Sequence, residues 1–372
     1  MRVIISGGGT GGHIFPALAI ADGLRRINPS IKFLFVGATG RMEMEKVPAA
    51  GYEIIGLNIT GINRSLSLSN LLFPFRLLGS LKKAMDIVRK FKPDVAVGVG
   101  GYASGPLLWA ASKSKVPTVI QEQNSYPGIT NKMLASKANV ICTGYADMEQ
   151  YFPSAKLLFT GNPVRKEMVD IVGKRDESFS FFGLDSTKPV LLVVGGSQGA
   201  RSINHAIRNG LDVLRDSEIQ LVWQCGKSFL PEALESIKSA GYTNARVFDF
   251  ISRMDYAYAA ANLVVSRAGA STVSELCVVG KPAIMVPLPT AAEDHQTHNC
   301  MAMVSKGAAL LVKDADSGTS LVAKAIETLH DQQLLQQLGD NMSRLSVTDA
   351  ADRIAQKVYE LASQHFKTVS SN

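Results

Sequence analysis

Cysteine is scarce in this sequence, and the four cysteines present, Cys142, Cys225, Cys277 and Cys300, lie far apart. No two of them form a Cys-x-x-Cys pair, which excludes a disulfide scaffold and a cysteine zinc site and is typical of a reducing compartment. Long apolar runs are lacking too, because an uncharged stretch such as Val95–Ser112 is interrupted by four glycines and a proline. That stretch predicts a strand, a glycine turn and a helix start instead of a membrane span. The first residues enter a strand and a glycine turn directly, so no signal peptide is expected.

The sequence does contain enough apolar material for two domains. It has 372 residues, of which 46% are hydrophobic and 19% charged, and a typical domain has about 150 residues. The formal net charge is +7, and it is concentrated in one half. Residues 1–165 hold nineteen Lys and Arg against nine Asp and Glu, whereas residues 166–372 hold twenty against twenty-three. The basic half is therefore expected to meet a phosphate-bearing substrate, a lipid headgroup surface or nucleic acid.

Short β-branched runs alternate with helical segments along the chain. The runs of the first half are Val3–Ile5, Lys32–Val36, Val95–Val99, Val116–Ile120 and Val140–Cys142. The pattern restarts with Pro189–Val194, a helix over Ser202–Leu214, and then Leu221–Gln224, Arg246–Phe248, Leu263–Ser266, Ala283–Val286 and Ala309–Val312. This alternation predicts an α/β fold with two doubly wound, Rossmann-like domains built on parallel sheets. We expect the first domain at residues 1–163 and the second at 164–345, with a final helix at 350–366 packing back on the first domain.

Three glycine-rich turns, Gly7–Gly12, Gly100–Gly105 and Gly195–Ala200, each follow an apolar strand and precede a helix. Glycine lets the backbone approach a ligand closely, and the N–H groups at a helix N-terminus favour phosphate or pyrophosphate. The first turn also satisfies the GxGxxG pattern of nicotinamide enzymes. That fingerprint requires an acidic residue at the end of the second strand, and none occurs before Glu43. The turns therefore predict a nucleotide-diphosphate ligand.

Seven segments point to one family. They are GGGTGGHIFPALAI (7–20), GGYASGP (100–106), QEQN (121–124), GNPVR (161–165), GGSQGAR (195–201), SRAGASTVSEL (266–276) and residues 294–299. On these segments the chain closely resembles the MurG family, the bacterial N-acetylglucosaminyltransferases of peptidoglycan lipid synthesis, over nearly its whole length. The resemblance implies a GT-B glycosyltransferase fold, in which two parallel sheets face each other across a cleft.

The same resemblance implies a reaction. N-acetylglucosamine (GlcNAc) moves from UDP-GlcNAc to undecaprenyl-pyrophosphoryl-MurNAc-pentapeptide, which converts lipid I to lipid II with inversion at the anomeric carbon. No cofactor is implied. The resemblance therefore implies a transferase of peptidoglycan synthesis and cell wall biogenesis, with roles in cell shape and cell division.

The expected diphosphate site of the donor lies in the second domain. Ser197 supplies a hydroxyl beside a helix start, and a second helix opens at Ala270, Ser271, Thr272, Val273, Ser274 and Glu275. The N–H groups of this helix start and the Thr272 hydroxyl suit a diphosphate. The expected acceptor-diphosphate site uses the first glycine turn of the other domain, at Thr10, Gly11 and Gly12.

Four further residues are expected to bind the donor. Glu275 can accept hydrogen bonds from both ribose hydroxyls, and Gln296 can hydrogen-bond the sugar hydroxyls. Arg165 is expected to reach the diphosphate and to stabilise the leaving UDP. The resemblance alone implies that Ile251 presents backbone groups to the uracil.

His13 directly follows the first glycine turn and is the candidate general base that takes the proton from the acceptor hydroxyl. Glu122 is the alternative base, and the residues do not decide between the two. Asn124 is expected to contact the sugar or the acceptor. Inversion needs a single displacement, so no covalent intermediate is expected.

No metal site is expected. His295 and His298 follow two acidic residues, but Gln296 and Asn299 suit sugar contacts better than a metal cage. Residues 314–316 form an Asp-Ala-Asp sequence, the metal signature of another glycosyltransferase architecture, and here we expect a solvated loop.

Residues 60–92 combine many large apolar residues with seven Lys and Arg against the single acid Asp86. This composition suits a helix on an anionic leaflet, so we expect peripheral membrane contact through about residues 62–83. The resemblance implies a location at the cytoplasmic face of the inner membrane. It also implies other cell-wall synthesis proteins as partners. Nucleic acid is not expected, because the basic residues are mixed with leucine and not with stacking aromatics.

Two other functions fit part of the sequence. A non-hydrolysing UDP-GlcNAc epimerase would share the two-domain frame without needing a lipid acceptor. A non-catalytic nucleotide-sugar-binding scaffold would use the glycine turns without a base.

Overall fold

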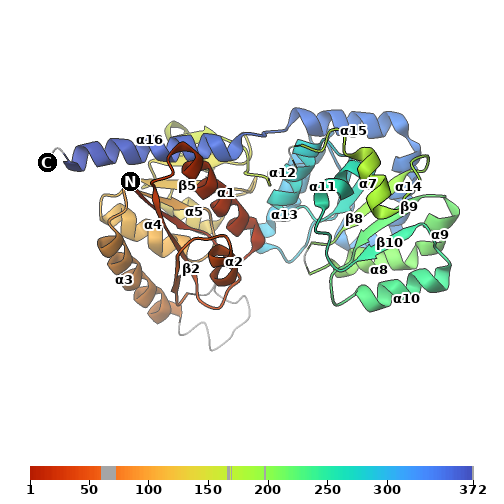
Figure 1. Cartoon of the computed structure of the whole chain (residues 1–372), viewed down its shortest axis with the longest axis horizontal. Helices are drawn as coiled ribbons and strands as arrows, with labels where there is room; N and C mark the ends of the chain where they lie inside the picture. Colours follow the sequence, from red (N-terminus) through yellow and green to blue (C-terminus); the bar gives the residue numbers. More distant parts are fainter. Residues whose placement is uncertain (60–72, 166–167, 169, 197, 371–372) are drawn as a thin grey trace. The chain divides into compact units, whose positions relative to one another are not determined.

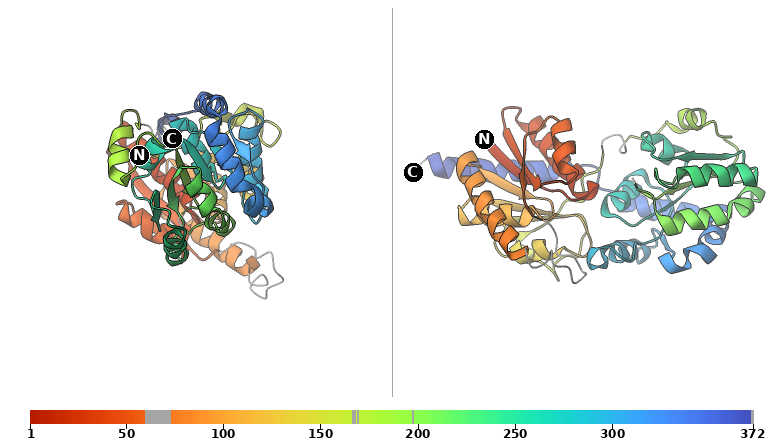
Figure 2. Two further views of the ribbon diagram at one scale, coloured as in Figure 1. Left: turned by 90° about the vertical axis from the view of Figure 1, so that its right-hand side faces the viewer. Right: turned by 90° about the horizontal axis from the view of Figure 1, so that it is seen from below.

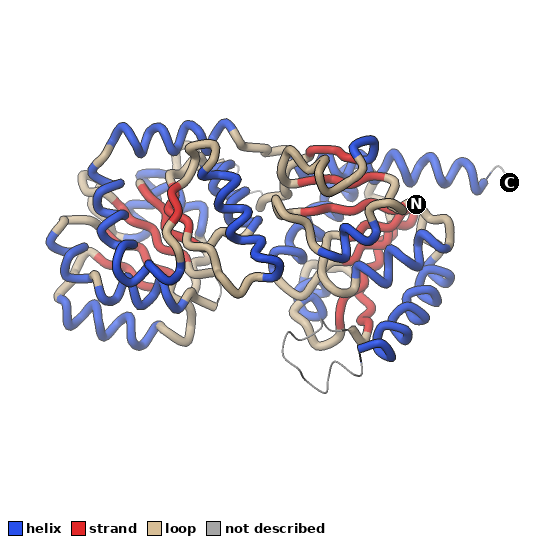
Figure 3. The backbone as a smooth tube through the Cα atoms, turned by 180° about the vertical axis from the view of Figure 1, so that it is seen from behind, coloured by secondary structure: helices blue, strands red, loops and turns tan. Residues whose placement is uncertain are grey.

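The computed structural model describes residues 1–59, 73–165, 168, 170–196 and 198–370. The chain divides into two compact units, Met1–Val164 with Asp349–Asn372, and Arg165–Thr348. In each unit the strands lie between helices, as Figure 3 shows in red and blue. The predicted α/β class with two doubly wound, Rossmann-like domains is confirmed.

The first unit has a seven-stranded parallel sheet in the order β3-β2-β1-β4-β5-β6-β7 (Figure 1). Its strands are β1 (Arg2–Ser6), β2 (Lys32–Ala38), β3 (Ile54–Leu57), β4 (Val95–Gly98), β5 (Thr118–Glu122), β6 (Val140–Thr143) and β7 (Leu157–Phe159). Its helices are α1 (Gly11–Ile27), α2 (Glu43–Ala49), α3 (Phe73–Phe91), α4 (Ser104–Lys113), α5 (Ile129–Leu134), η2 (Ser154–Lys156) and α16 (Ala350–Ser370). The strand order reverses between β1 and β4, so this is the switch point of the sheet.

The second unit has a six-stranded parallel sheet in the order β10-β9-β8-β11-β12-β13. Its strands are β8 (Val190–Val194), β9 (Gln220–Gln224), β10 (Ala245–Phe248), β11 (Leu263–Ser266), β12 (Ala283–Met285) and β13 (Leu310–Leu311). Its helices are α7 (Arg175–Phe182), α8 (Arg201–Asn209), α9 (Leu211–Asp216), α10 (Leu230–Ala240), α11 (Met254–Ala260), α12 (Ala270–Val279), η3 (Ala292–Asp294), α13 (His295–Val304), η4 (Asp314–Asp316), α14 (Ser317–His330) and α15 (Gln332–Arg344). The switch point here lies between β8 and β11.

The last helix, α16, packs along α1 in the first unit (Figure 2). Ile354 and Val358 are fully buried in the core of this unit, as expected for a helix with one apolar stripe. The two helices approach closely at Gly23, where an added Cβ atom would lie 2.9 Å from the Cβ atom of Ala355. A larger side chain at position 23 would push α16 away from the sheet.

Three details differ from the sequence prediction. The single helix expected over Ser202–Leu214 is wrong, because α8 ends at Asn209 and α9 begins at Leu211. The break falls at Gly210, where a Cβ atom would come within 2.6 Å of Val322, so α14 packs directly on the backbone there. The strands β3 and β7 were not expected, because both are short and lie at the two edges of the sheet.

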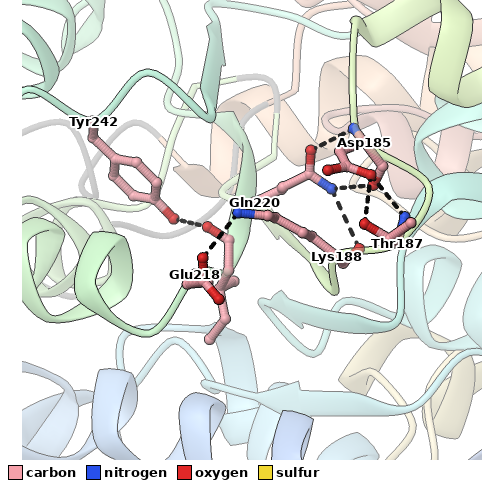
Figure 4. Close-up of polar contacts among 7 residues, drawn as sticks. Asp185, Thr187, Lys188, Glu218, Gln220 and Tyr242 are labelled. Atoms are coloured by element: carbon pink, nitrogen blue, oxygen red, sulfur yellow. Dashed lines mark hydrogen bonds and ion pairs between the residues drawn. The ribbon is translucent and has the colours of Figure 1, made fainter.

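A polar network lies at the amino-terminal ends of β8 and β9 (Figure 4). The glycine turn of this unit lies at the other end of β8. The Gln220 side chain accepts a hydrogen bond from the Asp185 backbone N–H and donates one to the Asp185 carbonyl oxygen, each at 2.7 Å. Hydrogen bonds from Thr187 lower the pKa of Asp185. Lys188 forms an ion pair with Glu218 at 3.1 Å. These contacts join the segments that lead into β8 and β9.

Candidate active site

The first glycine turn lies at the carboxyl end of β1, at the switch point of the first sheet. The strand ends at Ser6 and α1 begins at Gly11. Ligands of open parallel sheets bind at this position, next to the amide groups of the following helix. Thr10 is exposed, and Gly11 and Gly12 are half-buried, so all three candidate acceptor contacts lie at the surface of the turn.

His13 lies in the first helical turn of α1, and its ring packs against the second glycine turn. An added Cβ atom on Gly100 would lie 2.7 Å from the ring atoms Cδ2 and Nε2 of His13, so glycine leaves the space for the imidazole. Gly100 also has a φ of +98°, which favours glycine. The Nδ1 atom of His13 lies 2.9 Å from the carbonyl oxygen of Gly8. The candidate base is therefore held by both glycine turns of the unit.

Glu122 ends β5, and its carboxylate is buried. It accepts hydrogen bonds from the backbone N–H and the side-chain amide of Asn124 at 3.0 and 3.2 Å. It also accepts from the Gly128 backbone N–H at 3.1 Å and from the Asn131 amide at 2.7 Å. Burial raises the pKa of Glu122, and these four hydrogen bonds oppose the shift. The carboxylate therefore holds the loop that carries Asn124.

In the second unit, the third glycine turn follows β8 at the switch point. Ser197, the candidate hydroxyl of this turn, lies outside the described residues. Next to the turn, Gln224 ends β9 and donates a hydrogen bond from Nε2 to the carbonyl oxygen of Gly196 at 2.9 Å. Its Oε1 accepts from the backbone N–H of Ile251 at 2.8 Å. Gln224 thus connects the glycine turn to the candidate uracil loop, and the Ile251 N–H is already engaged.

The candidate diphosphate helix α12 begins at Ala270, directly after the end of β11. The N–H groups of a first helical turn have no partner within the helix. Ala270, Ser271, Thr272 and Ser274 are half-buried. Val273 differs, because its side chain is buried in the core and only its backbone can face a ligand.

Glu275 and Arg165 contact each other, an arrangement that was not expected from the sequence. The Nε atom of Arg165 donates to Oε1 of Glu275 at 2.8 Å, and the Tyr258 hydroxyl donates to Oε2 at 3.2 Å. The Glu275 side chain is only 12% exposed. Burial and the Glu275 carboxylate raise the pKa of Tyr258 well above its usual value, so the phenol stays a donor.

The remaining candidates lie around the ends of β12 and β13. Gln296 is in the first turn of α13, where its Oε1 accepts from the Leu288 backbone N–H at 3.0 Å, so its amide group is anchored to this loop. The expectation of a solvated loop is wrong for Asp314, which forms an ion pair with Arg267 and accepts a hydrogen bond from Ser202. Within the described residues, no three His, Cys, Asp or Glu side chains gather as they would around a metal ion.

Asp255 stabilises the segment that carries the candidate uracil loop. Its buried carboxylate accepts hydrogen bonds from Arg253 and forms an ion pair with Lys174 at 3.2 Å. The hydrogen bonds from Arg253 are the main cause that lowers the pKa of Asp255 from 3.8 to about 2. A depressed carboxyl pKa stabilises the fold above the unfolded pKa, and this stabilisation is lost as the pH falls through the folded pKa.

We therefore expect Asp255→Asn to lower the free energy of unfolding of the second unit by about 1–2 kcal/mol at pH 7. The difference from the unsubstituted protein should shrink as the pH falls below 4 toward 2. Urea unfolding followed by Trp223 fluorescence in a Trp109→Phe background measures it. Asp216→Asn, in an exposed ion pair with Arg215, is the matched control and should change little. An equal effect of the two substitutions would contradict the prediction.

The sequence alone did not point to Gln224, Tyr258 or Asn131. Each one forms a hydrogen bond with a candidate site residue: Ile251, Glu275 or Glu122, respectively. The available signal for Gln224 was its position at the carboxyl end of β9, directly after three apolar residues. No comparable signal marks Tyr258 or Asn131. The partner of Tyr258, Glu275, is 17 residues away in the sequence, and the partner of Asn131, Glu122, is nine residues away.

Each unit thus places a glycine turn and helix N-termini at the switch point of a parallel sheet, with ionisable side chains beside them. Two such units in one chain define the class of two-domain proteins with the GT-B architecture. The chain belongs to glycosyltransferase family 28: residues 3–143 match its N-terminal domain and residues 190–354 its C-terminal domain. The resemblance to the MurG family is confirmed.

Two curated relatives carry the name UDP-N-acetylglucosamine--N-acetylmuramyl-(pentapeptide) pyrophosphoryl-undecaprenol N-acetylglucosamine transferase. The protein of Parabacteroides distasonis is 50% identical over 360 residues, covering 97% of this chain and 98% of its own. That of Cytophaga hutchinsonii is 51% identical over 360 residues, covering 97% and 96%.

Two solved structures show the same fold. The crystal structure of Acinetobacter baumannii MurG matches with a TM-score of 0.79 at 28% identity, covering 96% of this chain and 99% of that one. The UDP-GlcNAc 2-epimerase of Neisseria meningitidis, crystallised with UDP-GlcNAc, has a TM-score of 0.67 at 16% identity, covering 97% and 100%. At that identity the epimerase shows a shared fold alone, so the transferase relatives decide the class of enzyme: this chain is a hexosyltransferase.

Proposed function

We propose that this protein transfers GlcNAc from UDP-GlcNAc to undecaprenyl-pyrophosphoryl-MurNAc-pentapeptide. The observation that carries the proposal is the 50% identity over 97% of the chain to a transferase named for this reaction. The glycine turns after β1 and β8 and the start of α12 after β11 lie at the two switch points, where parallel sheets bind ligands.

The second unit binds the donor in this proposal. The amides that open α12 and the hydroxyls of Thr272 and Ser197 hold the diphosphate, since a helix N-terminus favours anions. The carbonyl of Ile251 faces the uracil, because its N–H is engaged by Gln224. The amide group of Gln296 donates to the sugar hydroxyls.

Donor binding exchanges partners around Glu275. Its Oε1 accepts from Arg165 in the structure, and in this proposal a ribose hydroxyl takes the place of the guanidinium on that oxygen. The released Arg165 is then available to the diphosphate, where a guanidinium stabilises the charge that develops on the leaving UDP. Ribose recognition and leaving-group stabilisation are thereby coupled.

The first unit supplies the base. The acceptor hydroxyl oxygen attacks the anomeric carbon, the bond from that carbon to the UDP oxygen breaks, and the hydroxyl proton passes to His13. We assign this role to His13 and not to Glu122, because both oxygens of Glu122 accept hydrogen bonds from donors within the unit. Glu122 positions Asn124 beside the acceptor instead.

The test is a transfer assay with radiolabelled UDP-GlcNAc and a short-chain lipid acceptor. We expect labelled disaccharide lipid and UDP in equal amounts, and UDP release only when the acceptor is present. UDP-GalNAc and UDP-glucose should react poorly. An epimerase would convert UDP-GlcNAc to its 2-epimer without acceptor, and a scaffold would bind the donor without turnover; either outcome would refute the proposal.

We also propose that the first unit contacts an anionic membrane surface. Phe75 and Leu78 of α3 are 73% and 64% exposed, and basic residues such as Lys82 lie on the same helix. The part of the expected 62–83 surface that precedes Phe73 lies outside the described residues. Among the helices that the structure describes, none has both the length and the apolar character to cross a bilayer. A surface contact is the form of association that an amphipathic helix supports.

Replacing Phe75 and Leu78 together with serine should weaken binding to phosphatidylglycerol vesicles by about tenfold or more, since each buried apolar side chain contributes about 1.5–3 kcal/mol at full burial. Vesicle sedimentation measures the binding, and transfer to a water-soluble acceptor analogue should be unchanged. Phe366→Ser removes a similarly exposed aromatic residue from α16 and is the matched control. Equal binding by the double variant and the unsubstituted protein would exclude α3 as the contact.

A further inference from the structure

Glu43 is a fully buried carboxylate for which the sequence suggested no role. It opens α2, directly after the turn that follows β2. Its Oε2 accepts a hydrogen bond from the backbone N–H of Gly9 at 2.8 Å, and its Oε1 accepts one from the backbone N–H of Ala38 at 2.9 Å. The carboxylate therefore ties the first glycine turn to the end of β2.

The N–H of Gly9 and the carbonyl of Gly8 belong to the same peptide group. That carbonyl oxygen lies 2.9 Å from Nδ1 of His13. A single planar peptide unit thus joins the two side chains, with the carboxylate of Glu43 on its N–H and the imidazole of His13 on its oxygen.

Two glycines make space for this carboxylate. An added Cβ atom on Gly8 would lie 2.2 Å from Oε1 of Glu43, and one on Gly37 would lie 2.5 Å from its Cγ. Any larger residue at either position would push the Glu43 side chain away from the turn. Glycine at positions 8 and 37 is therefore what allows the Glu43 side chain to lie against the turn.

We propose that Glu43 is a positioning residue for His13, acting through the Gly8–Gly9 peptide group. The inference rests on the proposed function, in which His13 is the base. A carbonyl oxygen only accepts hydrogen bonds, so a neutral His13 carries its proton on Nδ1 and its lone pair on Nε2. The proton of the acceptor hydroxyl passes to that Nε2 lone pair.

The carboxylate strengthens this arrangement. A peptide N–H that donates to a carboxylate is polarised, and hydrogen bonds in a chain reinforce one another. The Gly8 oxygen becomes a better acceptor, which holds the Nδ1–H tautomer and stabilises the imidazolium formed when His13 takes the proton. The third member of a catalytic triad performs this task by direct contact with the imidazole; here a peptide group lies between.

The experiment compares Glu43→Gln with Glu45→Gln. Glu45 lies on the same helix and is exposed, so its substitution makes the same charge change away from the glycine turn. We expect Glu43→Gln to lower kcat by about 10- to 100-fold, the range seen when the hydrogen-bonded partner of a metal-bound histidine is removed, with the KM for UDP-GlcNAc within twofold. Glu45→Gln should keep both parameters. An unchanged kcat in Glu43→Gln would overturn the proposal.

A spectroscopic measurement tests the same point without relying on turnover. In protein labelled with ¹⁵N-histidine, and with the His13 signals assigned by their loss in His13→Gln, the neutral ring should show a protonated Nδ1 and an unprotonated Nε2. Glu43→Gln should shift these signals toward a mixture of tautomers. An Nε2–H tautomer in the unsubstituted protein would overturn the proposal even if Glu43→Gln fails to fold. If the unsubstituted protein shows no GlcNAc transfer, the proposed function fails, and the NMR spectra still report on the hydrogen-bonded chain separately.

Discussion

Replacing His13 with glutamine should lower kcat for GlcNAc transfer by about 100- to 10,000-fold, the range that a positioned general base contributes. Glutamine retains a hydrogen-bonding side chain but cannot take a proton at neutral pH. The affinity for UDP-GlcNAc should stay within twofold, because the donor residues are in the other unit. Single-turnover transfer and calorimetry with UDP-GlcNAc measure the two quantities.

His330→Gln is the control for this experiment, since His330 is an exposed residue at the end of α14. It should leave both quantities unchanged. If His13→Gln keeps its turnover and Glu122→Gln loses it without a loss of thermal stability, the roles that we assign to these two residues are reversed.

Replacing Glu275 with alanine should weaken UDP-GlcNAc binding by at least about 100-fold. Two hydrogen bonds from ribose hydroxyls to a carboxylate would be lost, and each such bond to a charged group contributes about 1.5–3 kcal/mol. Calorimetry with the donor measures the change. The effect should be specific to the ribose: a donor that lacks the 2′-hydroxyl should bind the unsubstituted protein more weakly, whereas the alanine variant should bind both donors with similar affinity.

Glu275→Ala also removes the acceptor of Arg165 and Tyr258, so its melting temperature must be measured alongside. Glu235→Ala, on the exposed side of α10, is the control for the general effect of removing an acid from this unit. If Glu275→Ala discriminates between the two donors as the unsubstituted protein does, Glu275 does not bind the ribose.

The fold class was predictable because its signals are local. Apolar runs followed by glycine turns and helices repeat along the chain, and each turn lies where the sequence suggested, at the end of β1, β4 or β8. The edge strands β3 and β7 were not found, because a strand of three or four residues with one neighbour has too few apolar positions to form a pattern.

The candidate site was predictable where a residue lies in a glycine motif. His13 directly follows the first glycine turn, so the chain itself places it at the switch point of the first sheet. Arg165 and Glu275 were expected to act on separate parts of the donor, and the structure joins them across 110 positions of sequence. That contact depends on tertiary structure that brings Arg165 next to α12, which no local pattern encodes.

Glu43 illustrates the same limit. In the sequence, Glu43 was considered only as the acidic residue that a dinucleotide-binding fingerprint requires, and it lies beyond the end of the second strand. Its burial against Gly8 and Gly37 could not be predicted. By itself, the sequence determined the class of fold through its order of strands, glycines and helices, and the family through its seven motifs. It also determined that the candidate base directly follows a glycine turn. Only the tertiary structure decided which carboxylate reaches which amide. A hydrogen bond depends on tenths of an ångström between groups from different elements, and the packing of the whole unit sets that distance.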